Sequence, residues 1–264
     1  MEEKRYALIT GATGGLGKAF AYETAKQGYA LLLTGRSEEK LALLKTEIER
    51  EYAVEIRLYA ADLSNAESRK ALTDKIAEEG LKLSLLVNVA GADIQKALTE
   101  YTEEKIAFQC CVNFEAAASL CRFAILHKAE RLHILNISSV SGIYPMPYFA
   151  IYSATKGALT SFSQALREEM KGKGVNVTAV LPGAMPTRED IKEQIKGQGL
   201  WGKLAAKAPQ SVAIASLKAV KKNKRKVIIG FWNKIMRIGT AWMPTSWRLK
   251  FIARRWKKIE KDAF

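Results

Sequence analysis

Short apolar runs alternate with longer amphipathic segments through the first 230 residues of the chain. Seven runs are predicted to be strands: Tyr6–Ile9, Ala30–Thr34, Glu55–Ala60, Leu83–Val89, His133–Ile137, Asn176–Leu181 and Val227–Ile229. Most of them are apolar almost throughout, which is typical of parallel strands covered on both faces. Between them lie segments with helical spacing, among them Lys18–Gln27, Glu38–Arg50 and Glu67–Glu79.

This alternation predicts an α/β fold, a single Rossmann-like doubly wound parallel sheet of about seven strands with helices on both faces. Gly28 and Gly80 stand just past two of the helical segments, where glycine commonly ends a helix. No linker rich in Pro, Gly or Ser divides the chain. We therefore expect one domain: residues 1–230 form the sheet and its helices, and residues 231–264 add a basic, aromatic helical extension.

The composition is that of a chain with a full core, since 48% of its residues are hydrophobic and 26% charged. No run approaches the eighteen apolar residues of a membrane span, and the start does not read as a secretion signal. Cys110, Cys111 and Cys121 fall in one helical stretch, an odd cluster that favours thiols in a reducing compartment. We expect a cytoplasmic protein, with membrane contact limited to its surface.

Positive charge is concentrated in the tail. The formal net charge is +15, and residues 221–264 carry fourteen Lys/Arg against two Asp/Glu. All five tryptophans lie at or after Trp201, and four of them alternate with cations beyond residue 230. This pattern fits a helix on an anionic membrane surface, but also one that docks on its own domain, forms a subunit interface or presents a solvated face. No nucleic-acid-binding motif accompanies the charge, so we do not expect a nucleic acid partner.

A glycine-rich turn follows the first predicted strand. Gly11, Gly15 and Gly17 have the spacing GxxxGxG and precede a helix. Glycine allows a tight turn and a close approach to a ligand, and the helix N-terminus offers N–H groups to a pyrophosphate. The position of the turn between the first strand and first helix predicts a dinucleotide site.

The end of the second predicted strand indicates which dinucleotide binds. A carboxylate usually holds the ribose hydroxyls there, but this strand ends in Gly35 and Arg36. A guanidinium binds a 2′-phosphate that a carboxylate would repel, so we predict NADP(H) rather than NAD(H). Asp62 and Leu63, after the third strand, suit an adenine contact, although an Asp there is often only a helix cap.

A tyrosine–lysine pair supplies the candidate chemistry. Tyr152 and Lys156 are four residues apart and share a helix face, but Tyr22/Lys26 and Tyr101/Lys105 have the same spacing. Only Tyr152 has a hydroxyl thirteen residues earlier at the carboxyl end of a predicted strand, Ser139, where open α/β sheets keep their sites. Ser138 is a rival because strand ends are uncertain by a residue.

Taken together, the chain resembles the short-chain dehydrogenase/reductase family from about Tyr6 to Gly230. The match includes the glycine turn, Asn88-Val89-Ala90-Gly91, Asn113, the Ser139–Tyr152–Lys156 set, Pro182-Gly183 and Thr187. The resemblance implies the catalytic residues Asn113, Ser139, Tyr152 and Lys156. It implies, with the arguments above, that the cofactor contacts are Gly11, Thr13, Gly14, Gly15, Leu16, Gly17, Arg36, Asp62, Leu63, Asn88, Ala90, Gly91, Tyr152, Lys156, Pro182, Gly183 and Thr187.

The implied reaction is hydride transfer from NADP(H) to a carbonyl carbon, with Tyr152 as acid/base. Lys156 is expected to lower the Tyr152 pKa and to hold the ribose, Ser139 to donate to the oxyanion, and Asn113 to hold a water. His127 and His133 lack metal-ligand spacing, so no metal site is expected.

The substrate side is expected to be apolar and thus to favour a lipophilic ketone or aldehyde, such as an acyl or steroid-like one. Residues 184–207 are expected to form a lid, and the expected lining residues are Tyr144, Met146, Tyr148, Met185, Leu200 and Trp201. The family resemblance implies a homodimer or homotetramer. Two alternatives stay open: an NADP(H)-binding sensor or scaffold without turnover, and an interaction protein that acts through its tail.

Overall fold

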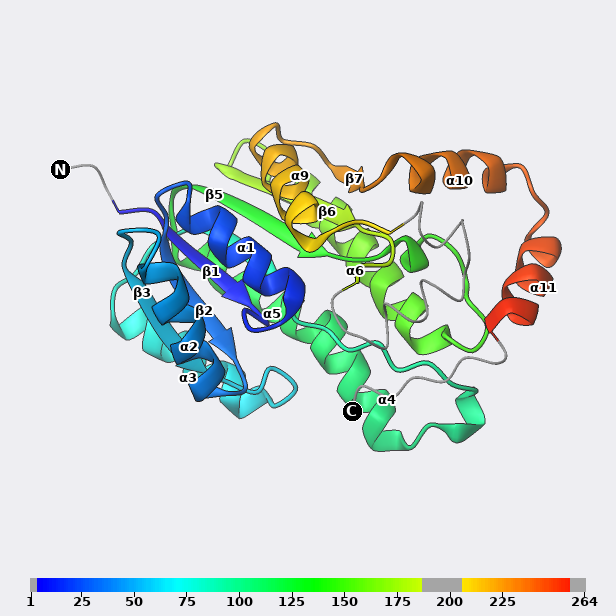
Figure 1. Ribbon diagram of the computed structural model, residues 1–264, viewed down its shortest axis with the longest axis horizontal. Helices are drawn as coiled ribbons and strands as arrows, with labels where there is room; N and C mark the ends of the chain where they lie inside the picture. Colours follow the sequence, from blue (N-terminus) through cyan, green and yellow to red (C-terminus); the bar gives the residue numbers. More distant parts are fainter. Residues whose placement is uncertain (1–3, 187–205, 257–264) are drawn as a thin grey trace.

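The fold is a seven-stranded parallel sheet between two layers of helices. A computed structural model describes residues 4–186 and 206–256. The strand order is β3-β2-β1-β4-β5-β6-β7, and every pair is parallel. The strands are β1 (Tyr6–Thr10), β2 (Ala30–Gly35), β3 (Ile56–Ala60), β4 (Leu83–Asn88), β5 (Lys128–Ile137), β6 (Val175–Leu181) and β7 (Lys226–Ile228). The predicted doubly wound sheet is confirmed (Figure 1).

Alternate residues of the central strands pack into two hydrophobic cores, one on each face of the sheet, because successive side chains of a strand point to opposite faces. Leu31 and Leu33 of β2 pack in one core with α1 (Gly15–Ala25), α2 (Glu38–Glu49) and α9 (Pro209–Lys221). Leu32 packs in the other, with α3 (Ala66–Glu78), α5 (Ala116–Leu126) and α6 (Ala150–Glu169). Burial of each such leucine stabilises the fold by ~1.5–3 kcal/mol. The near-continuous apolar runs of the sequence are explained by these two covered faces.

The element bounds differ from the sequence expectations mainly in β5. This strand begins at Lys128 rather than His133, and a register shift separates its first pairing, with Leu83, from the pairing of His133 with Leu85. The added residues include Glu130 and Arg131, which are exposed and polar, so no apolar run indicated them. Helix α1 begins at Gly15, inside the predicted glycine turn.

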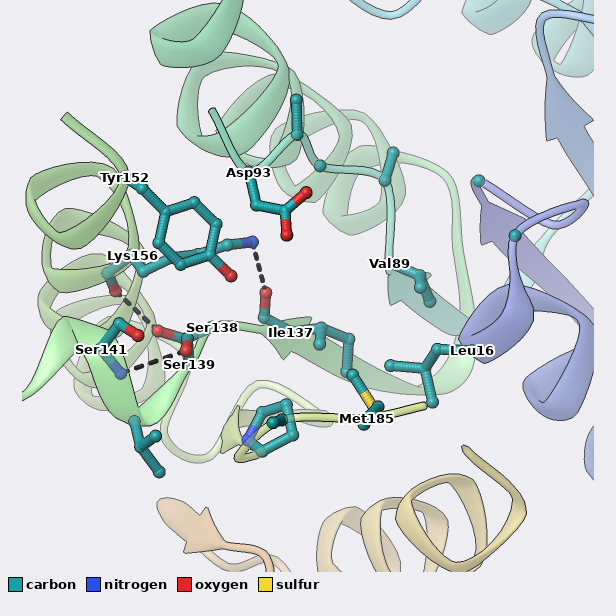
Figure 2. A pocket seen from close by; sticks show the side chains of 18 of the residues that line it. Leu16, Val89, Asp93, Ile137, Ser138, Ser139, Ser141, Tyr152, Lys156 and Met185 are labelled. Carbon is teal, nitrogen blue, oxygen red and sulfur yellow. Dashed lines mark hydrogen bonds between the residues drawn. The ribbon is translucent and has the colours of Figure 1, made fainter. Parts of the chain in front are cut away.

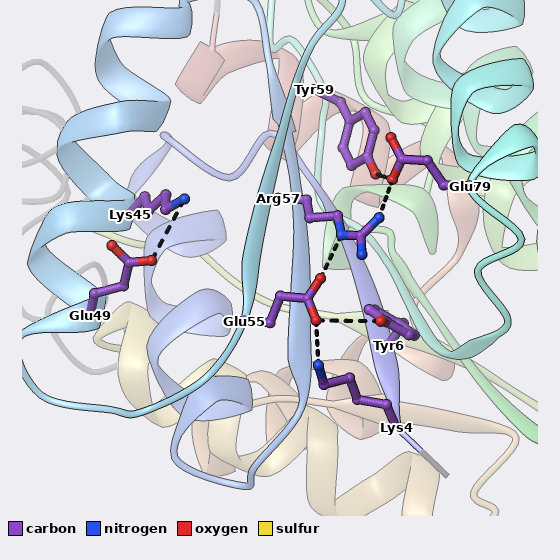
Figure 3. A network of polar contacts seen from close by, with 8 residues as sticks. All are labelled: Lys4, Tyr6, Lys45, Glu49, Glu55, Arg57, Tyr59 and Glu79. Carbon is purple, nitrogen blue, oxygen red and sulfur yellow. Dashed lines mark hydrogen bonds and ion pairs between the residues drawn. The ribbon is translucent and has the colours of Figure 1, made fainter.

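The edge strand β3 carries a polar network (Figure 3). Arg57 donates to Glu55 at 2.5 Å and to Glu79 at 2.6 Å, and Tyr59 donates to Glu79 at 2.6 Å. Lys4 pairs with Glu55 at 2.6 Å. Charged side chains along an edge strand prevent it from pairing with another sheet. This network therefore protects the edge of the sheet.

Two further helices, α10 (Phe231–Ala241) and α11 (Thr245–Trp256), follow β7. They extend beyond the sheet on the side of the carboxyl ends of its strands (Figure 1). The predicted helical extension is thus present. Within the described ranges, no helix combines the length and the apolar character that crossing a membrane requires.

The chain reverses its direction of winding between β1 and β4. The strands β2 and β3 lie on one side of β1, and β4 to β7 on the other. In open α/β sheets, ligands bind outside the carboxyl ends of the strands at this point.

Candidate active site

A cavity of about 1080 Å³ lies at this switch point. Its walls come from the β1–α1 turn, from the carboxyl ends of several strands, and from α6, α10 and α11. Pockets that hold one drug-sized ligand are ~300–1,000 Å³. The space is therefore larger than one drug-sized ligand requires.

The glycine turn forms one end of the cavity. Gly11 has φ +60°, and a Cβ on Gly17 would lie 2.0 Å from the carbonyl oxygen of Gly11, so neither position accepts a side chain without a shift. Helix α1 has no side chain capping its N-terminus and no acid in its first turn. By contrast, Ser37 and Asn65 cap α2 and α3. The first turn of α1 therefore keeps its N–H groups and its positive dipole end for an anion, as a pyrophosphate requires.

Arg36 and Asp62 line the cavity beyond the turn. Arg36 directly follows β2 and is exposed. Burial works to raise the Asp62 pKa, but hydrogen bonds from Ser64 and the charge of Arg36 leave that pKa below its ordinary value. One Asp62 oxygen accepts from both the N–H and the hydroxyl of Ser64, so it also shapes the turn before α3.

The loop after β4 is fixed by buried side chains from neighbouring strands. The Thr10 hydroxyl accepts from the N–H groups of Val89 and Ala90, both at 3.0 Å. Asn88 donates to Asn136 at 2.8 Å and is buried, outside the cavity lining. Ala90 and Gly91 line the cavity. Asn88 thus supports the loop, and its neighbours face the ligand space.

Asn113 holds the same loop from the other side. It lies in a π-helical turn, Cys111–Glu115, between α4 (Glu103–Cys110) and α5. Its amide accepts from the Ala92 N–H at 2.8 Å, donates to the Ala92 carbonyl at 2.9 Å, and donates to Thr155 at 3.1 Å. Because the side-chain nitrogen is used twice, this amide is a support for the loop, and it does not line the cavity. Its expected role in holding a water stays a prediction.

The two neighbouring serines are in different environments. The Ser138 hydroxyl donates to the Lys156 carbonyl at 2.7 Å and lies 2.7 Å from the Thr160 hydroxyl, which ties β5 to α6. The Ser139 hydroxyl accepts from the Ser141 N–H, and hydrogen bonding by this hydroxyl works to lower the pKa of Tyr152. Of the two hydroxyls, that of Ser139 is the one directed at the tyrosine.

Tyr152, Lys156 and Asp93 meet at the centre of the cavity (Figure 2). The Lys156 ammonium donates to the Ile137 carbonyl at 2.9 Å and lies 5.8 Å from the centre of the Tyr152 ring. Asp93, two residues after Gly91, directs its carboxylate toward both. The Phe149 ring stacks on Tyr152 with 4.2 Å between centroids.

The ionisation of these groups follows from burial and from Asp93. Burial lowers the pKa of Lys156 to about 8, against the raising effect of the Asp93 charge. Burial and Asp93 raise the pKa of Tyr152, and the hydrogen bond with Ser139 opposes them. From the sequence we expect a lowered Tyr152 pKa. The structure gives the opposite direction, because desolvation of the phenolate outweighs the lowering effect of Ser139.

The two rival tyrosine–lysine pairs are held elsewhere. Tyr22 donates to Glu47 at 3.3 Å, and Tyr101 donates to the Ile94 carbonyl at 2.8 Å outside any α-helix. Neither tyrosine lines the cavity.

The predicted substrate residues are brought together only in part. Tyr144, Met146 and Met185 line the cavity, whereas Tyr148, with φ +61°, does not. Phe149 takes the place expected for Tyr148. Thr187, Leu200 and Trp201, with most of the expected lid, lie outside the described residues. Pro182 and Gly183 line the cavity as expected.

Sequence reasoning missed Asp93, Phe149 and the wall formed by the tail. Asn233, Met236 and Arg237 of α10 and Phe251 and Ile252 of α11 line the cavity. A carboxylate just after the Asn88–Gly91 segment was a usable signal for Asp93. For the tail, the helical spacing indicated helices, but spacing within a helix carries no information about where the helix lies.

Comparisons with known proteins give a family match and similar proteins. Residues 5–196 match the short chain dehydrogenase family. The very-long-chain 3-oxoacyl-CoA reductase of Bos taurus is 37% identical over an alignment of 191 residues that covers 69% of this chain and 60% of the bovine protein. The chain thus spans about 60% of the length of such relatives.

Solved structures resemble the fold over most of the chain. A 7β-hydroxysteroid dehydrogenase is 26% identical with a TM-score of 0.83, over 94% of this chain and 96% of that one. The bulky-bulky ketone specific alcohol dehydrogenase from Comamonas testosteroni is also 26% identical, with a TM-score of 0.75, over 90% of this chain and 93% of that one.

Proposed function

The chain belongs to the short chain dehydrogenase family, and from that premise we propose that it is an NADP(H)-dependent reductase of lipophilic ketones. One observation carries the proposal: a single cavity contains both the uncapped N-terminus of α1 and the Ser139–Tyr152–Lys156 cluster. A dinucleotide on the first would extend toward the second, with room left for a substrate.

The residues present fit the dinucleotide. The glycine turn would hold the pyrophosphate, Ala90 and Gly91 would contact the ribose that lies toward Lys156, and Pro182 and Gly183 would border the nicotinamide. Gly91 has to lack a side chain, since a Cβ there would lie 2.9 Å from the Asn113 oxygen and 3.2 Å from the Lys156 nitrogen. When bound, the nicotinamide supplies the hydride, and the protein supplies orientation and a proton.

Preference for NADP(H) rests on Arg36. Its guanidinium lies at the carboxyl end of β2, where a carboxylate would be needed to favour NAD(H). The cavity wall also contains Asp62, whose charge interacts with that of Arg36. The Asp62 carboxylate accepts hydrogen bonds from Ser64. The adenosine end is therefore suited to a 2′-phosphate.

Tyr152 would donate the proton that the carbonyl oxygen requires. A pKa raised by burial keeps its phenol protonated at neutral pH, which favours the direction of reduction. The Ser139 hydroxyl would donate to the same developing oxyanion. Lys156, with a pKa of about 8, exchanges protons near neutrality and would compensate the charge left on Tyr152.

The substrate end is apolar and large. Met146, Phe149, Met185, Met236, Phe251 and Ile252 contribute to its walls. The names of the relatives, a very-long-chain 3-oxoacyl-CoA reductase and dehydrogenases of a steroid and of bulky ketones, agree with this character. We propose a bulky or long-chain ketone, with a 3-oxoacyl thioester as the first candidate.

The cofactor assignment can be tested with Arg36→Ala. Loss of charge-assisted hydrogen bonds worth ~1.5–3 kcal/mol should weaken NADPH binding ~10–100-fold and leave NADH binding unchanged. Binding of both dinucleotides would be measured by fluorescence titration. Arg50→Ala, at the far end of α2, removes the same charge from an exposed position and should change neither. An unaltered preference for NADPH in Arg36→Ala would contradict the assignment.

Turnover would be tested by NADPH oxidation across 3-oxoacyl thioesters, steroid ketones and bulky aryl ketones. Reduction of members of this panel, increasing with apolar surface, is the expected result. Tight NADPH binding without turnover on any of them would instead indicate a sensor of the dinucleotide.

A further inference from the structure

Helix α10 has two opposite faces with different surroundings. Asn233, Met236 and Arg237 line the cavity, and Thr240, one turn on, lies 2.7 Å from the Tyr144 hydroxyl. The other face carries what we call the outer stripe: Phe231, Ile235, Ile238 and Trp242. At about 100° per residue, the centres of the two faces are about 180° apart. One face of α10 is thus a wall of the active site, and the other faces away from the protein.

The outer stripe is exposed. Phe231 and Ile238 are each 67% exposed, Trp242 90% and Ile235 39%. Of the twelve large apolar side chains that are exposed in the described parts of the chain, eight lie between Phe231 and Phe251. The other four, Leu43, Leu98, Leu126 and Ile214, are on four different elements. Single exposed apolar residues are ordinary, but a cluster of this size marks an interaction surface.

The charge of the same segment indicates the partner. Residues 231–256 contain six Lys/Arg and no Asp/Glu. Lys234 and Lys250, one on each helix, are exposed. A second copy of this chain would present the same cations across a two-fold contact, which like-charge repulsion opposes. An anionic lipid surface accepts both the cations and the exposed tryptophans, which favour the level of the headgroups.

The cavity reaches the surface beside this segment. Phe251 of α11 lines the cavity and is also 66% exposed, and Trp247, one turn before it, is 67% exposed. Tyr144 links the two helices to the segment between Ser139 and Tyr152, since its hydroxyl contacts Thr240 and its ring lies 5.0 Å from the Arg248 guanidinium. The opening of the cavity therefore lies next to the exposed side chains of α10 and α11.

We propose that α10 docks the protein on an anionic lipid surface through the outer stripe, together with the exposed cations of α10 and α11, and that the cavity takes its substrate from that surface. The docking follows from exposure and charge alone. Uptake of the substrate from that surface rests on the proposed reduction of a lipophilic ketone. Tyr144, Met236 and Phe251 would then form the passage between lipid and Tyr152.

Co-sedimentation with vesicles tests the docking. The full chain should sediment with phosphatidylcholine vesicles that contain phosphatidylglycerol, and much less with phosphatidylcholine alone or at high salt. Ile238→Ser/Trp242→Ser should lower the partition coefficient by ~tenfold or more. Leu43→Ser/Leu126→Ser removes two apolar side chains of similar exposure from α2 and α5 and should leave it unchanged.

A charge-matched pair of variants separates electrostatic from apolar contributions. Lys234→Glu/Lys250→Glu should reduce binding to the anionic vesicles by ~tenfold or more, since each cation near such a surface contributes ~1 kcal/mol. Lys82→Glu/Lys173→Glu makes the same change in net charge at exposed positions next to the amino ends of β4 and β6, and should have little effect. Thermal unfolding of each variant would check that it folds.

Outcomes against the proposal are clear. It is overturned if the full chain does not sediment with anionic vesicles, or if the stripe and control variants lose binding equally. It is also overturned if analytical ultracentrifugation shows a dimer that Ile238→Ser/Trp242→Ser dissociates. Turnover of a water-soluble ketone without vesicles reports on the proposed function separately, because none of these variants alters a residue that lines the cavity.

Discussion

The ionisation of the site depends on a carboxylate that faces a lysine and a tyrosine. Asp93 raises the pKa of both Lys156 and Tyr152, while burial acts on them in opposite directions, lowering the first and raising the second. The result is a protonated phenol beside an ammonium whose pKa is about 8. At neutral pH the pair therefore holds its protons and can release one to a substrate oxygen.

Asp93→Asn tests this coupling through the pH dependence of reduction. Without the carboxylate, the Lys156 pKa should fall further below about 8, because the only effect that opposes burial is gone. Since the ammonium form is required, the alkaline loss of kcat/KM should begin at lower pH than in the wild type. Asp74→Asn removes the same charge from the exposed face of α3 and should leave the profile in place. An identical profile for Asp93→Asn would show that this carboxylate does not set the titration.

The glycine turn and α6, the helix that carries Tyr152 and Lys156, are positioned by close backbone packing. A Cβ on Gly17 would lie 2.0 Å from the Gly11 oxygen, and one on Gly142 would lie 2.6 Å from the Lys156 carbonyl carbon. The first contact brings α1 onto the turn, and the second brings the segment after Ser139 onto α6. In both cases the added Cβ would clash with a backbone atom, so the clash could not be removed by rotating a side chain.

Gly17→Ala should therefore displace the N-terminus of α1 from the turn. We expect NADPH affinity to fall by ~tenfold or more and the free energy of unfolding to fall by ~1–3 kcal/mol. Gly239→Ala is the matched control: a Cβ there meets nothing within 4 Å, and alanine in a helix is favoured over glycine by up to ~1 kcal/mol. Dinucleotide titration and thermal unfolding measure both effects. Full affinity and stability in Gly17→Ala would mean that the turn adapts.

The sequence was sufficient for the elements that repeat a simple pattern. All seven strands and the glycine turn were predicted because most of the strands are apolar almost throughout and because the turn requires residues without side chains. The start of β5 at Lys128 was not, since its first residues are polar and paired through the backbone. The sequence also did not indicate that Asn113 supports the loop. The direction of its side chain is set by a π-helical turn, which the residue pattern did not predict.

The two tail helices line the candidate active site. Residues from α10 and α11 close a cavity whose opposite end is the β1–α1 turn, more than 200 residues earlier in the chain. The sequence left open whether the apolar side of the tail docks on its own domain. The outer stripe does not dock there, because its side chains are exposed. Which side of a tail helix faces the cavity depends on tertiary packing, and helical spacing alone could not decide it.

Isotope transfer tests whether Tyr152 supplies the proton that completes hydride transfer from NADPH to a ketone. The enzyme would be given NADPH deuterated at the transferred position and a ketone from the panel that it reduces, and the alcohol would be analysed by mass spectrometry. The wild type should yield an alcohol with one deuterium on the carbinol carbon. Tyr152→Phe should bind NADPH with unchanged affinity and yield at least ~10²-fold less of it. Undiminished deuterated alcohol from Tyr152→Phe, or bound NADPH that never passes its deuterium to any ketone, would contradict the account.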